Sequence, residues 1–117
     1  MDAFEKLDVW KRSSRLCVDL YRDVQKCRDS GFRDQISRAA LSVPSNIAEG
    51  FERDSPKDFA RFLRIAKGSC GEVRTQLYIG VELGYLARNS GKAFLEESRE
   101  IAKMLQGLIK RCESRAT

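Results

Sequence analysis

Seven arginine and lysine residues in this sequence have a type and spacing that favour one chemistry, the binding of a polyanion. They are Arg12, Arg15, Lys57, Arg61, Arg64, Lys67 and Arg74. Spacings of 4, 3, 3 and 7 separate the last five, so a helix brings the first three of these onto one face and Lys67 to its margin. Cations in such a row can contact the phosphates of a nucleic acid. We therefore predict these seven residues as contacts to RNA or DNA.

The same basic row has a second explanation, a solvated helix face whose charges pair with nearby acids such as Asp58 and Glu72. No helix-turn-helix spacing, zinc finger or aromatic RNA-binding motif accompanies the row. A nucleic-acid contact would therefore depend on shape and charge, with little reading of base sequence. The net charge of +5, from 22 Lys and Arg against 17 Asp and Glu, permits a polyanionic partner and also suits ordinary solubility.

Residues suited to catalysis or to metal binding are scarce. The chain has no histidine, which removes the commonest general base and metal ligand. Its cysteines form no CxxC pair and fall among apolar residues of a helical pattern, which predicts buried, reduced thiols. These are Cys17, Cys27, Cys70 and Cys112. We expect a protein that is not an enzyme, with no catalytic residue, no metal, no cofactor and no small-molecule substrate.

Four helices would position these side chains. Apolar residues recur at intervals of three and four along the chain, no strand pattern competes, and a length of 117 residues indicates one domain. We predict helices at about 6–29, 32–52, 56–87 and 91–114. Because the connections between them are short, the sequence predicts a single all-α domain over residues 1–117, an antiparallel up-down four-helix bundle.

The two prolines mark special positions in the second and third predicted helices. Ser55 suits an N-cap, Pro56 the first helical position, and Asp58 the third. Pro44 stands inside the second helix and removes the N–H that would bond to the carbonyl of Ala40. The apolar row keeps its helical register across this proline, which favours one kinked helix over a break.

The third predicted helix carries more apolar side chains than one buried stripe can hold. The surplus consists of Phe62, Ile65, Tyr78, Ile79, Val81, Leu83, Tyr85 and Leu86. A helix that is apolar on nearly all sides is buried on more than one side. In a small bundle the second side must meet another chain, so we expect a homo-oligomer.

The sequence also bears on the compartment. No run approaches the roughly 18–20 apolar residues that a membrane span needs. The first six residues contain no apolar core of a signal peptide. We therefore expect a cytoplasmic protein with no membrane partner.

Three segments closely resemble a family of bacterial four-helix bundle proteins. They are FEKLDVWK at 4–11, SVPSNIAEG at 42–50 and FARFLRIAKGS at 59–69. The family includes proteins encoded in intervening sequences of large-subunit rRNA genes, and it is similar to the accessory variability protein of diversity-generating retroelements. The likeness covers nearly the whole chain.

The resemblance implies a kinked second helix, a cytosolic location and assembly into a ring, a homopentamer. The retroelement relatives bind nucleic acid and a reverse transcriptase through basic surfaces. We therefore predict a non-enzymatic, oligomeric accessory protein that binds RNA or DNA without sequence preference. The alternative is a scaffold for protein–protein interaction, with a protein partner and no nucleic-acid role.

Overall fold

The computed structural model describes residues 3–116, and four α-helices account for most of them. The helices are α1 (Asp8–Asp23), α2 (Ser30–Phe51), α3 (Pro56–Glu82) and α4 (Arg88–Ala116). Two short 3-10 helices, Phe4–Lys6 and Val24–Lys26, flank α1. Residues 3–116 contain no strand, which confirms the all-α fold. Residues 1, 2 and 117 of the predicted domain lie outside the described residues.

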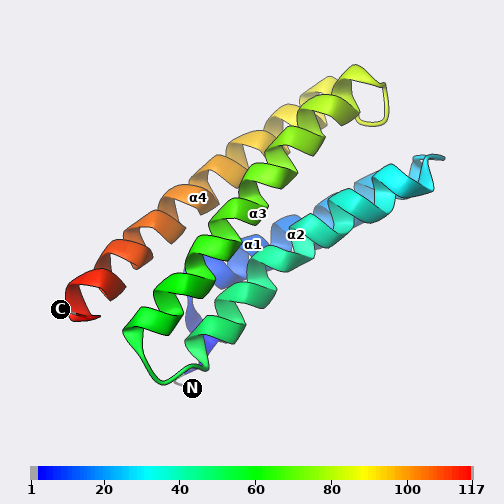
Figure 1. Cartoon of the computed structure of the whole chain (residues 1–117). Coiled ribbons are helices and arrows are strands. Elements are labelled where there is room, and N and C mark those ends of the chain that lie inside the picture. The colour runs from blue at the N-terminus through cyan, green and yellow to red at the C-terminus, as the bar shows by residue number, and fades with distance from the viewer. Residues whose placement is uncertain (1–2, 117) are drawn as a thin grey trace.

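The four helices lie along one direction in a molecule with extents of 47 × 22 × 21 Å (Figure 1). α2 packs against α1 and α3, and α4 packs against α3 and α1. One end of the molecule, here called the terminal end, holds the α2–α3 turn and the C-terminus of α4. The opposite end holds the α1–α2 and α3–α4 turns. Segments far apart in the sequence therefore meet at each end.

The core is formed by apolar side chains from the inner faces of all four helices. The largest fully buried ones include Leu20, Ile36, Ile47, Leu63, Leu77, Ile101 and Leu105. Complete burial of each such side chain contributes about 1.5–3 kcal/mol to the free energy of folding. Intervals of three and four residues separate most of the buried positions within each helix, as expected for helices that each bury one face.

Side-chain caps begin α2 and α3. Ser55 accepts a hydrogen bond from the Asp58 N–H at 3.1 Å, with Pro56 in the first helical position, as predicted. Asp29 accepts one from the Phe32 N–H at 3.0 Å. Its second carboxylate oxygen accepts the Tyr85 hydroxyl at 2.8 Å, which links the α1–α2 turn to the α3–α4 turn. The Phe32 N–H above all, and then Tyr85, hold the pKa of Asp29 below its ordinary value.

Several predicted helix boundaries are wrong. The first helix ends at Asp23, not at 29, because the chain tightens into a 3-10 turn and then becomes extended at Cys27. The third ends at Glu82, not at 87, because Gly84 takes a φ of 77°. This left-handed residue lets the Tyr85 N–H bond to the Gly80 carbonyl at 2.8 Å and closes the helix. The fourth helix begins at Arg88 rather than at 91.

α2 continues unbroken through Pro44, which is buried; the predicted kink at this residue stays a prediction. Near its C-terminal end α2 comes very close to α3. A Cβ atom on Gly50 would stand 2.6 Å from the Cβ of Phe62 and 3.0 Å from the Phe59 ring. Only glycine therefore permits this separation of the two helices.

Replacing this glycine gives a first test of the close approach. We expect Gly50→Ala to lower the free energy of unfolding by about 1–3 kcal/mol, because the stem of Phe62 cannot move without the backbone of α3. Gly107→Ala is the matched control, since no atom lies within 4 Å of its added Cβ. That variant should gain about 0.5–1 kcal/mol from helix propensity. Urea unfolding followed by circular dichroism measures both, and equal effects would contradict the close approach.

The Asp29 link predicts a pH dependence. Because the folded state lowers the pKa of Asp29, its stabilisation is complete above the ordinary value of 3.8 and is lost as pH falls through the lower folded value. Asp29→Ala should therefore reduce the urea midpoint at pH 7, and the gap to the unmodified protein should narrow below about pH 4. Tyr85→Phe removes only the cross-link and should cause a smaller loss at pH 7. A gap that is constant from pH 7 to pH 3 would contradict this role.

Candidate nucleic-acid interface

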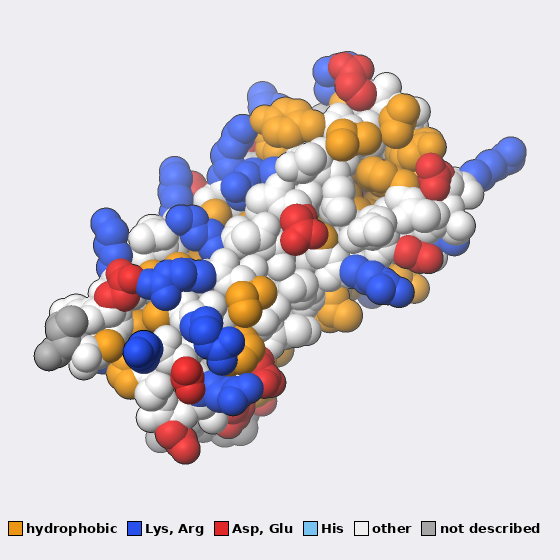
Figure 2. Space-filling view, in the orientation of Figure 1, with side chains coloured by type: hydrophobic (Ala, Val, Ile, Leu, Met, Phe, Trp, Pro, Cys, Tyr) orange, Lys and Arg blue, Asp and Glu red, His pale blue; other side chains and the backbone are white. Residues whose placement is uncertain are grey.

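The N-terminal half of α3 holds four of the seven predicted contacts together. Lys57, Arg61, Arg64 and Lys67 are all exposed there, and we call them the α3 basic row. Figure 2 shows blue side chains over much of the surface toward the terminal end, whereas a group of orange side chains covers the part near the α3–α4 turn. The exposed side of α3 therefore changes from basic to apolar along its length.

The α3 basic row is only partly compensated by acids. Arg64 forms an ion pair with Glu113 of α4, with side chains 51% and 53% exposed, and exposed pairs of this kind contribute about 0–1 kcal/mol. Lys67 donates to the neutral amide oxygen of Gln106 at 2.6 Å, which leaves its charge uncompensated. The guanidinium of Arg61 lies over the Phe62 ring, 4.6 Å from its centroid. Three of the four cations thus have no acidic partner within residues 3–116.

The structure does not bring the two basic residues of α1 to this row. Arg12 donates two hydrogen bonds to the Glu97 carboxylate on α4, at 2.9 and 2.5 Å, and this contact raises its pKa. Arg15 pairs with Asp19 at 3.0 Å. α1 packs against α2 and α4 rather than against α3. The second explanation, a solvated face of paired charges, therefore describes Arg12 and Arg15 better than a phosphate track does.

Arg74, the last of the predicted contacts, lies apart from the row. It is half-buried, and its Nη1 is buried without a hydrogen-bond partner among the residues that the structure describes. The acids proposed as partners of the basic row, Asp58 and Glu72, form no ion pair with it within residues 3–116. Glu113, from a different helix, pairs with the row instead.

A pocket at the terminal end was missed by sequence reasoning. It has a volume of about 290 Å³ and is lined by Phe51, Arg53, Asp54, Ser55, Pro56, Phe59, Leu108, Arg111, Cys112 and Arg115; we call it the terminal pocket. Its α4 residues are spaced 0, 3, 4 and 7, which puts them on one helix face. That spacing is a usable signal in the sequence, but basic residues near the end of a helix are also expected because they complement the helix dipole.

The cysteines are free, and all but the half-buried Cys17 are buried. Burial raises the pKa of Cys70 to about 11. Burial also raises the pKa of Cys112 in the terminal pocket, where Arg115, Arg111 and Arg64 oppose the shift. The positive charges of these three guanidinium groups are therefore felt at the Cys112 thiol in the pocket. Residues 3–116 contain no cluster of three or more potential metal ligands of the His, Cys, Asp or Glu type.

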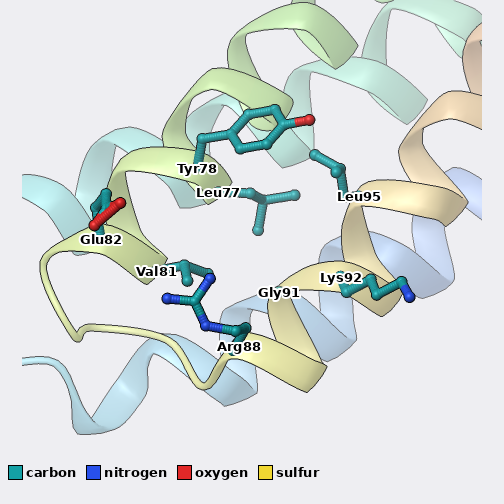
Figure 3. A pocket seen from close by; sticks show the side chains of 8 residues that line it. All are labelled: Leu77, Tyr78, Val81, Glu82, Arg88, Gly91, Lys92 and Leu95. Atoms are coloured by element: carbon teal, nitrogen blue, oxygen red, sulfur yellow. The ribbon is translucent and has the colours of Figure 1, made fainter.

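A second pocket, of about 230 Å³, lies at the opposite end between α3 and α4 (Figure 3). Leu77, Val81 and Leu95 give it an apolar lining, with Arg88 and Lys92 at its α4 side. Close to it, three large apolar side chains in the last turns of α3 and just after its end are exposed, by 49–57%. They are Tyr78, Ile79 and Leu83, and we call them the apolar end patch. Among the surplus apolar residues of the sequence, these three and Ile65, which is 44% exposed, stay on the surface of a single chain.

None of the helices within residues 3–116 has the length and apolar character needed to cross a membrane. This finding agrees with the absence of a long apolar run in the sequence.

Comparison with known proteins identifies the family. Residues 5–107 match the model of the 23S rRNA-intervening sequence protein family. A similar solved structure is that of a protein of unknown function from the S23 ribosomal protein family of Bacteroides thetaiotaomicron, with 27% identity and a TM-score of 0.81. The match covers 87% of this chain and 98% of that one. No curated protein matches the chain. Since the family model spans most of the sequence, the chain belongs to the 23S rRNA-intervening sequence protein family.

Proposed function

We propose that this protein is a non-enzymatic, oligomeric accessory protein of the cytoplasm that binds RNA or DNA without sequence preference through the α3 basic row. The observation that carries the proposal is the exposed row itself, in which three of four cations lack an acidic partner within residues 3–116. The exposed Arg64–Glu113 pair can open at little cost, so a phosphate can replace the carboxylate.

The oligomer that we propose is a ring of antiparallel up-down bundles, each kinked at Pro44, with a homopentamer implied by the family resemblance. The apolar end patch supports self-association, because Tyr78 and Leu83 leave more than half of their side-chain surface in water. Contiguous apolar side chains at this exposure are typical of interfaces. The second copy is the occupant that we assign to this patch.

A second candidate function is a scaffold that binds a protein partner. The pocket in Figure 3 favours it, since an apolar cavity beside an exposed apolar patch can receive a side chain of another protein. In that case the α3 basic row would be a solvated surface. A pull-down with and without nuclease separates the two functions, because a partner protein retained after nuclease treatment supports the scaffold.

The salt dependence of binding tests the nucleic-acid function. We expect the logarithm of the affinity for RNA to fall linearly with the logarithm of salt concentration. Lys57→Ala and Arg61→Ala should each reduce the slope by about 1, because each removes one phosphate contact. Arg15→Ala is the matched control: it removes the same charge from α1, where Asp19 already pairs with it, and should change the slope much less. No binding at low salt, or a flat slope, would rule out the proposal.

Light scattering tests the oligomer. The unmodified protein should have a mass that is a multiple of the 13.3 kDa chain, and Leu83→Arg should lower this mass because it places a charge in the interface. Leu41→Arg on α2 is the matched control, since both leucines are 57% exposed. A mass of one chain for the unmodified protein would refute self-association. Equal dissociation of both variants would show that the apolar end patch is not the interface.

A further inference from the structure

The terminal pocket has an aromatic floor. The rings of Phe51 and Phe59 meet edge to face, with centroids 5.8 Å apart and planes at 88°. Both rings are half-buried, and Leu108 and Cys112 complete the apolar lining. Pockets for small ligands have volumes of about 300–1,000 Å³, so a cavity of about 290 Å³ suits one small ring system. A flat, weakly polar ring fits this floor better than a flexible chain does, because stacking on aromatic side chains needs only a π-face.

The rim of the terminal pocket is basic. Three arginines and one acid, Asp54, surround the opening. Arg53 is already held by Glu49 at 2.9 Å and lies over the Phe62 ring. Arg111 and Arg115 form no hydrogen bond or ion pair within residues 3–116 and stand one helical turn apart on α4. Two free guanidinium groups at this spacing can each donate two hydrogen bonds to phosphate oxygens.

The pocket adjoins the α3 basic row. Arg53 from the pocket and Arg61 from the row lie over the same ring, that of Phe62, at 4.9 and 4.6 Å from its centroid. On α4, Glu113, the partner of Arg64, directly follows Cys112 of the pocket floor. The row and the rim of the pocket therefore meet at Phe62, so a strand whose phosphates follow the row can place its next nucleotide at the pocket.

We propose that the terminal pocket binds one unpaired nucleotide, with its base against Phe51 and Phe59 and its phosphate on Arg111 and Arg115. A base within a duplex is stacked on both faces and cannot enter, whereas a base in a single strand, a loop or a strand end can. The protein therefore prefers unpaired to duplex nucleic acid. This strand preference rests on the proposed function, but the binding of a free mononucleotide in the pocket does not.

Titration of the full-length protein with AMP, adenosine and inorganic phosphate, followed by NMR, tests the pocket itself. AMP should bind at least tenfold more tightly than phosphate or adenosine alone, because only AMP uses both the floor and the rim. Arg111→Gln should weaken AMP binding about tenfold by removing a charged donor. Phe59→Leu should weaken it similarly by removing a stacking ring. Arg15→Gln, the same charge change on α1, should leave AMP binding unchanged.

Affinity for a single-stranded RNA and for a duplex of equal length tests the strand preference. We expect the single strand to bind at least tenfold more tightly, and Arg111→Gln to reduce this ratio while Arg15→Gln preserves it. If circular dichroism shows that Phe59→Leu does not fold, Arg111→Gln and Arg115→Gln decide the question, since both residues are exposed.

Each outcome has one meaning. If AMP binds no more tightly than phosphate, or if the pocket variants do not change its affinity, the terminal pocket is not a nucleotide site. RNA binding with equal affinity for single strand and duplex overturns the strand preference and leaves the proposed function in place. AMP binding without binding of any RNA supports the pocket and overturns the proposed function.

Discussion

The close approach of α2 and α3 at Gly50 is the constraint on which the terminal end depends. Because no side chain separates the helices there, the stem of Phe62 and the ring of Phe59 lie directly against the α2 backbone. Phe59 then meets Phe51 edge to face. Phe62 lies where Arg53 and Arg61 can both cover it. One absent methyl group therefore positions both the aromatic floor of the terminal pocket and the start of the α3 basic row.

α3 packs one side into the core and carries two different surfaces on its other side, the α3 basic row and the apolar end patch. Its inner side is buried from Leu63 to Leu77 and is apolar apart from Ser69. Its outer side carries the α3 basic row in the first half and the apolar end patch at the end of the second. The division matters because burying cations in an apolar interface would remove them from water at a large cost in free energy. One stretch of helix surface therefore cannot serve both as an apolar interface and as a basic surface for a ligand. Separation along the helix would let the apolar end patch meet another chain in the proposed oligomer while the α3 basic row stays in water.

Sequence patterns were sufficient for the number and order of the helices and for the Ser55 cap, because these depend on local spacing, although several helix ends were placed wrongly. The sequence could not show that Gly80 and Gly84 have different roles, because the two glycines are four residues apart, as in a helix-packing motif. A Cβ on Gly80 would stand 2.6 Å from the Phe32 ring, whereas Gly84 has open space around it and a positive φ that ends α3. The difference depends on what lies opposite each glycine, and that is a tertiary property.

The candidate site shows the same limit. Spacing within α3 correctly grouped Lys57, Arg61 and Arg64, but it could not tell how α1 is rotated relative to α3. Spacing alone makes Arg12 equivalent to the row, whereas in the structure Glu97 of α4 pairs with it. The terminal pocket is built from α2, the α2–α3 turn and α4, so no single stretch of sequence carries its pattern.

The proposed oligomer would compensate for the small size of each basic row. A row of four cations, one of them already paired, releases few counterions and binds a strand weakly at physiological salt. A ring formed through the apolar end patch would repeat the row once per subunit, at the end of each bundle away from the interface. Binding of a strand to one row then raises the effective concentration of the same strand at the next, which increases the total affinity without any new contact. In this proposal self-association and nucleic-acid binding are coupled, because assembly of the ring would raise the affinity for a strand that contacts several rows.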